Sequence, residues 1–225
     1  MKKAICLISA GIDSPVAATL MSKKYEIILL HFVLYPFYCK GSFNKMIEIM
    51  KHLKNKMKYK YLILFPWAEI LSKISKAREK DIYRKYMCVL CRRAMFKTAE
   101  KIAKKEKIDF IITGESLAQK ASQTLQNMIA TTSGIKIPIL QPLLGLDKIE
   151  IEKLSKKLSI WFEKHVGCCE LNPDRPITKA RPEILDKLYQ ELDLEKIINK
   201  NLKNIQKIKS LEKPEKYFSI LLKKL

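Results

Sequence analysis

A loop with phosphate-binding chemistry stands near the start of the chain, at Ser9-Ala10-Gly11-Ile12-Asp13-Ser14. An apolar run precedes it and a helical run follows it, so its backbone N–H groups lie at the positive end of a helix dipole. Gly11 permits close approach of the backbone, and two serines add hydroxyl donors. Asp13 is an acid in an anion site, which a bridging Mg²⁺ would explain. The loop lacks the second glycine and the lysine of the Walker pattern, and a plain strand-to-helix turn capped by Ser14 is the alternative interpretation.

Cysteines are the next candidates for chemistry. Cys88 and Cys91 form a C-x-x-C motif that two arginines follow, and we expect a helix to begin there, so that both cations and dipole favour thiolates. Cys168 and Cys169 are the other cluster. A closed zinc site needs four ligands, and adjacent cysteines rarely face one metal, so the arithmetic suggests three ligands. They are Cys88, Cys91 and either Cys169 or Cys168.

Three thiolates have more than one use. They could hold an iron–sulfur cluster with an open iron site, or one thiol could carry a persulfide that another resolves. A structural or zinc role is the third alternative. Cys6 lies in a buried predicted strand and is expected in the core, Cys39 is ambiguous, and the three histidines show no ligand spacing.

Short apolar runs that alternate with longer amphipathic ones predict the elements that position these residues. Strands are expected at residues 4–8, 27–32, 61–65, 109–113 and 137–140, and helices at 15–23, 44–58, 67–85 and 88–107. This alternation predicts an α/β fold, a parallel five-stranded sheet with helices on both faces.

Ligands of such sheets bind at the carboxyl ends of the strands. That rule places residues 9–14, 31–39, 66 and 114–123 on one rim. We therefore include His31 and Phe32 among the candidate ATP contacts. The run that follows Gly114 is rich in small and amide side chains, which suits contact with a nucleotide, although a polar loop with a capped helix would look the same.

The composition is that of a globular protein with an unusual charge. Of 225 residues, 44 are Lys or Arg and 23 are Asp or Glu, a net charge of +21. Such an excess favours a polyanionic partner, since Lys and Arg that neutralise phosphates release counterions; a uniformly solvated basic surface is the alternative. No signal peptide or membrane span is expected, which predicts a cytoplasmic protein with reduced thiols. Residues 183–225 lack glycine and are rich in lysine, which predicts a basic helical extension behind a first domain at 1–182.

Four motifs, in order over residues 5–182, resemble those of a known family. The loop is similar to the PP-loop, Ser-Gly-Gly-x-Asp-Ser, of ATP pyrophosphatases, with Ala10 in place of a glycine. Alanine fits there if its φ is negative. The matching segments are Ile12-Asp13-Ser14-Pro15-Val16-Ala17, Thr113-Gly114-Glu115-Ser116-Leu117-Ala118-Gln119 with Ala121-Ser122-Gln123-Thr124-Leu125, Pro142-Leu143 with Asp147-Lys148, and Cys168-Cys169 with Pro176-Ile177-Thr178-Lys179. They resemble the tRNA 4-thiouridine synthase (tRNA sulfurtransferase) family.

The resemblance implies roles for particular residues. Gly114 lies beside the nucleotide, and Gln119 and Gln123 line its site. Lys148 matches a lysine needed for activity, and facing the α-phosphate it would stabilise the charge that builds as pyrophosphate leaves. A cysteine matching Cys169 takes part in sulfur transfer. Members without a rhodanese domain carry a C-x-x-C that binds a cluster, and this sequence is expected in that group.

The resemblance also implies a reaction. We expect ATP, with Mg²⁺, to adenylate a carbonyl oxygen of the substrate, uridine in tRNA, which sulfur then replaces. The PP-loop begins at Ser9, so the family's ferredoxin-like region and THUMP domain are expected to be absent. The basic surface, a separate tRNA-binding partner or a non-tRNA substrate would then compensate. The sulfur donor is a protein or free sulfide, and a homodimer is one arrangement. Amidation of an adenylated substrate and a non-catalytic RNA-binding or sulfur-carrier module are the alternative functions.

Overall fold

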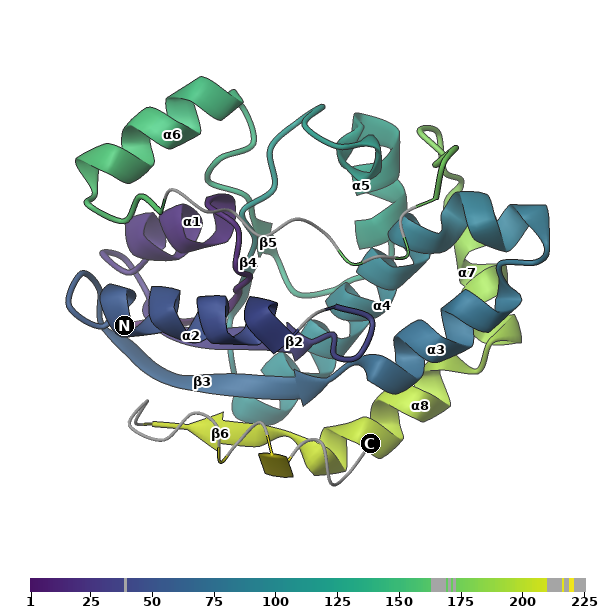
Figure 1. Cartoon of the computed structure of the whole chain (residues 1–225), viewed down its shortest axis with the longest axis horizontal. Coiled ribbons are helices and arrows are strands. Elements are labelled where there is room, and N and C mark those ends of the chain that lie inside the picture. Colours follow the sequence, from purple (N-terminus) through teal and green to yellow (C-terminus); the bar gives the residue numbers. More distant parts are fainter. Residues whose placement is uncertain are drawn as a thin grey trace.

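Six strands form one sheet, in the order β5-β4-β1-β2-β3-β6, which carries the candidate site (Figure 1). A computed structural model of the chain describes residues 1–38, 40–162, 169, 171, 173–209, 216, 219 and 220. The strands are β1 (Lys3–Leu7), β2 (Glu26–Val33), β3 (Tyr59–Pro66), β4 (Phe110–Ile112), β5 (Ile139–Leu140) and β6 (Gln206–Ile208). Neighbours are parallel except β6, which is antiparallel to β3.

Helices cover both faces of the sheet (Figure 1). The helices α1 (Asp13–Met21), α2 (Lys40–Leu53) and α6 (Lys148–Lys157) lie on one face. The other face carries α3 (Ala68–Ala77), α4 (Asp81–Glu106), α5 (Leu125–Thr132), α7 (Pro182–Glu191) and α8 (Leu194–Asn201). Two short 3₁₀ turns are η1 (Ala121–Gln123) and η2 (Leu202–Asn204). The α/β class with helices on both faces is as predicted.

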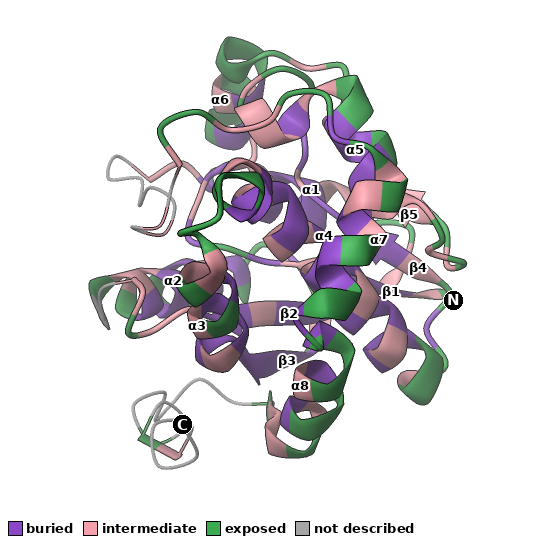
Figure 2. Ribbon diagram, turned by 90° about the vertical axis from the view of Figure 1, so that its right-hand side faces the viewer, coloured by how far each residue is buried: buried purple, intermediate pink, exposed green. Residues whose placement is uncertain are grey.

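The apolar strands explain this layering, because side chains of a strand alternate between the two faces. Ile5 and Ile28 point into the core under α4, whereas Cys6 and Leu29 point into the core under α1 and α2. All four are at most 1% exposed. Burial is concentrated in the strands and the inner faces of the helices (Figure 2). A sheet buried on both faces accounts for the continuous apolar runs in the sequence.

The sheet has six strands rather than the predicted five, and the sixth comes from a segment predicted to be helical. Ile208 pairs with Leu62, and Lys207 pairs with Ile63, so β6 covers the edge of β3. Residues 206–208 have no strong local preference for a strand. A distant edge with unpaired N–H and C=O groups determines their conformation. The predicted division into residues 1–182 and 183–225 stays a prediction, and α7, which begins at Pro182, packs on α4 through Leu185 and Leu188.

The longest helix begins earlier than expected. The predicted helices 67–85 and 88–107 are instead α3, which ends at Ala77, and α4, whose 26 residues run from Asp81 to Glu106. Cys88 and Cys91 therefore lie well inside α4. The dipole of this helix gives their thiols no first-turn stabilisation, and that part of the prediction is wrong.

Candidate functional site

The loop after β1 is held by its own serine side chains. The Ser9 N–H donates to Ser14 Oγ at 2.9 Å, and the two hydroxyl oxygens are 3.0 Å apart. The Gly11 N–H points to Ser9 Oγ at 3.3 Å. No side chain caps α1 at Ile12, so its first N–H groups have no such acceptor in the part of the chain that the structure describes. This arrangement leaves an anion-binding helix N-terminus at the end of the central strand.

Ala10 fits the loop without strain. It is 8% exposed, and its backbone is not among the positive-φ residues, so the Cβ atom costs nothing there. The negative φ that an alanine needs at this position is therefore present. A Cβ atom on Gly11 would lie 3.5 Å from Ser9 Oγ, an ordinary contact. Packing within the chain therefore does not require Gly11, and close approach of a phosphate remains the predicted reason.

Gly114 is required by packing. It follows β4, the neighbour of β1 on the side where the strand order reverses. A Cβ atom on Gly114 would lie 2.5 Å from the Ser14 nitrogen and 2.6 Å from the Asp13 carbonyl carbon. Both are backbone atoms that cannot move aside. Gly114 thus holds the rim of β4 against the first turn of α1, at the switch point where α/β sheets bind ligands.

A lysine from the far side of the rim reaches the loop. Lys148 Nζ lies 3.1 Å from Asp13 Oδ1, although the two residues are 135 positions apart. Lys148 is the first residue of α6, and a capping box between Asp147 and Glu150 fixes that helix end. The pair is partly exposed and contributes at most about 1 kcal/mol to stability. Its ammonium balances the charge of the Asp13 carboxylate in this structure.

The side chains of His31 and Phe32 have different surroundings at this rim. His31 Nδ1 lies 2.9 Å from the Ile8 carbonyl oxygen, so Nδ1 carries the proton and Nε2 is free to accept a hydrogen bond. Burial lowers the pKa of His31 to about 4, against a weaker opposing effect of that hydrogen bond. Phe32 is only 6% exposed and packs edge-on against Trp67 in the core. Only the main chain of Phe32 could serve the predicted ATP contact.

The amide side chains of the second rim segment point to different places. Gln119 Nε2 donates to Ser116 Oγ at 3.1 Å. Gln123 is 7% exposed, and its Oε1 is buried without a partner among the described residues. Gln123 also lines a cavity of about 660 Å³ on the α4 side of the sheet. An unpaired buried amide oxygen is costly and marks a place for a donor from outside the chain.

The cysteines share that cavity. Cys88, Cys91 and Cys169 all line it, beside Gln123 and apolar side chains of α3 and α4. The Trp67 indole N–H donates to Cys91 Sγ at 3.3 Å, which stabilises a thiolate there. Cys168 lies outside the described residues, as do Cys39 and His165. Within those residues no group of three Cys, His, Asp or Glu could hold a metal ion. Cys6 is in the core as predicted, and burial raises the pKa of its thiol.

A scan against models of protein families matches residues 1–194 to the family described as thiamine biosynthesis protein (ThiI). The chain belongs to the ThiI family. It is 35% identical over 215 residues to a Finegoldia magna protein and 36% identical over 196 residues to one from Methanocaldococcus jannaschii, both named "Probable tRNA sulfurtransferase". These matches cover 92% and 85% of this chain and 53% and 50% of the relatives. The chain therefore spans about half the length of these curated relatives.

A solved structure agrees with this assignment to the ThiI family. The crystal structure of a 4-thiouridine synthetase–RNA complex with bound ATP superposes with a TM-score of 0.79 at 30% identity. The match covers 92% of this chain and 55% of the other. The resemblance found in the sequence is thus confirmed. No helix among the described residues of this ThiI-family chain is both long and apolar enough to cross a membrane.

Sequence reasoning missed one polar network under the rim. Glu115 is 6% exposed and forms an ion pair with Arg92 of α4. It also accepts hydrogen bonds from Thr113 Oγ1 at 3.0 Å and Gln141 Nε2 at 2.5 Å. Arg92 is therefore neutralised by Glu115, and it contributes less to thiolate stability than its place beside Cys91 suggested. A carboxylate directly after a strand-ending glycine was the available signal.

Proposed function

We propose that this protein is the catalytic part of an ATP-dependent tRNA sulfurtransferase. In the first step, a uridine carbonyl oxygen attacks the α-phosphorus of ATP, the bond to the β-phosphate breaks, and pyrophosphate leaves. In the second, a sulfur nucleophile attacks the activated ring carbon, and AMP departs with the oxygen. The products are thiouridine, AMP and pyrophosphate. The family and the likeness to a 4-thiouridine synthetase with bound ATP support this proposal.

The PP-loop would hold the phosphates of ATP. Backbone N–H groups of residues 9–14 and the first turn of α1 supply donors, and the neighbouring rim of Gly114 keeps that turn in place. Lys148 is within reach of the loop, where its ammonium would stabilise charge on the leaving pyrophosphate. Asp13 is the carboxylate that would hold Mg²⁺ together with phosphate oxygens, and Mg²⁺ would neutralise charge on the phosphates. Gln119, His31 and Gln123 would complete the nucleotide site.

One observation favours thiolation over other uses of an adenylated substrate. Gln123, expected beside the nucleotide, lines the same cavity as Cys88, Cys91 and Cys169. Thiols thus lie next to the adenylation rim. A cysteine that has taken a sulfane sulfur from the persulfide of a donor protein would attack the activated carbon through its terminal sulfur and expel AMP. A second thiol would then attack the S–S bond, releasing the thiolated base and leaving a disulfide. A thiol reductant restores the pair. With free sulfide as the donor, HS⁻ itself displaces AMP and no cysteine is oxidised.

An iron–sulfur cluster on Cys88, Cys91 and Cys169 is the alternative sulfur route. The described residues do not assemble three ligands for it, and Cys168 lies outside them, so we derive no step through a cluster. Anaerobic purification followed by iron and sulfide analysis tests it. We propose that the protein works in the cytoplasm, where reducing conditions would keep these thiols reduced. The tRNA would be held by the basic surface, by a separate partner or by a second copy of the chain.

Pyrophosphate release from ATP in the presence of bulk tRNA tests adenylation, and absorbance of thiouridine in the recovered tRNA tests sulfur transfer. With a protein persulfide as the sulfur donor, we expect Cys91→Ala to retain pyrophosphate release and to lose thiolation. Cys6→Ala, in the core, is the matched control and should retain both. An amidating enzyme would keep product formation in the Cys91 variant. Absence of pyrophosphate release with tRNA and with small acceptors would overturn the proposal.

A further inference from the structure

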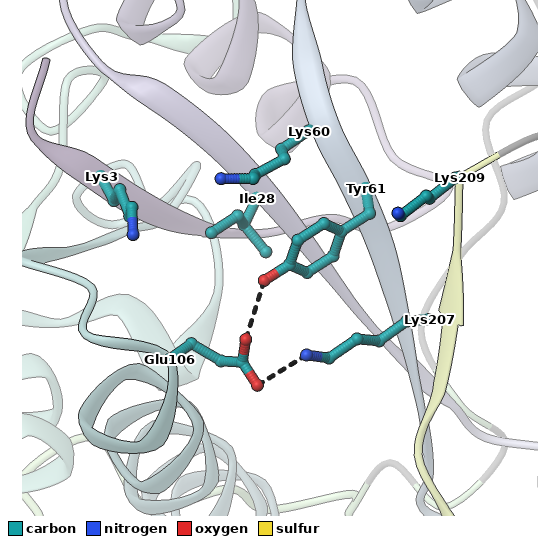
Figure 3. A pocket seen from close by; sticks show the side chains of 7 residues that line it. All are labelled: Lys3, Ile28, Lys60, Tyr61, Glu106, Lys207 and Lys209. Atoms are coloured by element: carbon teal, nitrogen blue, oxygen red, sulfur yellow. Dashed lines mark hydrogen bonds and ion pairs between the residues drawn. The ribbon is translucent and has the colours of Figure 1, made fainter.

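A second pocket lies at the end of the sheet opposite the PP-loop, around the amino ends of β1 and β3 (Figure 3). Its volume is about 640 Å³, and four lysines line it, namely Lys3, Lys60, Lys207 and Lys209. Lys3 and the PP-loop serine Ser9 stand six residues apart along an extended segment, a distance of about 20 Å. This hollow, the lysine pocket, is therefore separate from the nucleotide site.

The fold brings the lysines together from three strands. Lys207 and Lys209 are two residues apart at β6, so their side chains point to the same face. The pairing of β2 with β3 shifts between Ile27 and Leu29, where β3 holds one residue more than β2. This bulge sets both Lys60 and Tyr61 opposite Ile28 on the pocket side. Bulges commonly re-aim side chains next to binding sites.

Cations outnumber acids in the lysine pocket. Glu106, at the end of α4, accepts hydrogen bonds from Lys207 Nζ at 2.7 Å and from the Tyr61 hydroxyl at 3.0 Å (Figure 3). Glu26, which does not line the pocket, accepts a hydrogen bond from Lys60 Nζ at 2.8 Å. For Lys3 Nζ and Lys209 Nζ, the described part of the chain provides no carboxylate within ion-pair distance. The two glutamates therefore orient two ammonium groups and leave the other two available.

The glutamates stay charged and the pocket still has a positive balance. The hydrogen bond from Lys207 is the main cause that lowers the pKa of Glu106, and Lys105 adds to it. Tyr61, with Lys207 Nζ 5.2 Å from its ring centroid, forms a firm floor at 9% exposure. The ammonium groups around this floor match a diffuse anion with several oxygens. The negative end of the α4 dipole opposes an anion here, but only by a fraction of a charge.

We propose that the lysine pocket binds a phosphodiester of the RNA backbone, so that the RNA substrate contacts this chain at a point remote from the nucleotide site. The inference rests on the proposed RNA substrate. RNA is favoured over a small anion because Lys and Arg that neutralise phosphates of a polymer release its condensed counterions, a gain that a single small anion does not offer. The net charge of +21 adds a general attraction for the same polymer.

The test measures binding of fluorescent tRNA across a range of salt. We expect Lys3→Gln with Lys209→Gln to weaken binding about 3- to 10-fold and to lower the slope of log K against log salt by about 1 to 2, as for the loss of two phosphate contacts. Lys187→Gln with Lys196→Gln, exposed lysines of α7 and α8, is the matched control and should change neither quantity by as much. Equal effects in both double variants would contradict a specific pocket.

Acetylation footprinting of the wild-type protein gives an independent readout. RNA should protect Lys3 and Lys209 more than Lys187 and Lys196. Protection by inorganic tripolyphosphate but not by RNA would assign the pocket to a small anion and overturn the proposal, as would protection by neither. Pyrophosphate release at saturating tRNA should be unchanged in the Lys3/Lys209 variant. Loss of thiolation in every protein, with the footprint retained, would refute the proposed function and leave the pocket standing.

Discussion

The Lys148 ammonium lies 3.1 Å from the Asp13 carboxylate, and this contact joins the first turn of α6 to the first turn of α1. The two helix beginnings meet over the carboxyl end of the central strand. A lysine held at this place can exchange its carboxylate partner for a phosphate without moving its helix. We propose that Lys148 exchanges Asp13 for a phosphate when ATP binds.

Substitution of Lys148 should separate catalysis from stability. We expect Lys148→Ala to lower pyrophosphate release at least 100-fold, because a cation facing the leaving group is lost, while the free energy of unfolding changes by less than about 1 kcal/mol. Steady-state kinetics and denaturation of the same preparation measure both. Lys153→Ala, an exposed lysine of the same helix, is the control. Equal activity of the two variants would contradict a role for Lys148.

Gly114 should tolerate no side chain. We expect Gly114→Ala to destabilise the protein by about 1 to 3 kcal/mol and to weaken ATP binding, because the added Cβ atom would push the first turn of α1 out of place. Calorimetric titration with a non-hydrolysable ATP analogue measures the affinity. Gly145→Ala is matched to it, since a Cβ atom there would meet nothing within 4 Å. If both alanine variants bind the analogue alike, the packing argument fails.

His31 makes stability depend on pH in one window. Its pKa is lowered to about 4, whereas in the unfolded chain it is near 6.5. Between these values only the unfolded state takes up the proton, so stability falls as pH decreases through the window, by about 3 kcal/mol in total. Denaturation of wild type and His31→Gln at pH 4.5, 5.5 and 7 should show a flatter dependence for the variant. Parallel curves would count against the buried neutral imidazole.

Trp67 should tune the reactivity of Cys91. Its indole N–H donates to the sulfur at 3.3 Å, which favours thiolate. Trp67→Phe keeps an aromatic ring against Phe32 but removes the donor, so alkylation of Cys91 should slow several-fold and its pH midpoint should move upward. Iodoacetamide labelling followed by mass spectrometry gives both quantities. The same substitution in a Cys91→Ala background should leave labelling of Cys88 unchanged, and a change there would indicate disturbance of the whole cavity instead.

The sequence was informative where chemistry is local. A loop of this composition, with a strand before it and a helix after it, is a contiguous signal, so residues 9–14 could be proposed as a phosphate site together with the elements that flank them. Lys148 could be singled out only through the family resemblance, because no local pattern in the sequence connects it with Asp13. The three-dimensional route between them became visible only when α1 and α6 packed side by side.

Other features depend on partners that sequence patterns do not encode. The strand β6 exists because β3 offers an edge, and local preference in residues 206–208 is weak. Cys88 was expected at a helix beginning because the break between α3 and α4 comes earlier than the pattern indicated. Arg92 was expected to stabilise the thiolates, but Glu115, which lies 23 positions away in the sequence, neutralises its charge. The lysine pocket was hidden for the same reason, since its members come from distant strands.

The helix α4 carries Cys91 near its middle and Glu106 at its last residue. One continuous helix therefore lines both the cavity that holds the cysteines and the lysine pocket. Fifteen residues of helix fix their separation at about 22 Å and also fix their rotational phase. Inserting one residue between them would advance one end by about 1.5 Å and turn it by about 100°. This rigid helix would hold an RNA phosphate bound in the lysine pocket at a constant distance from the Cys91 thiol.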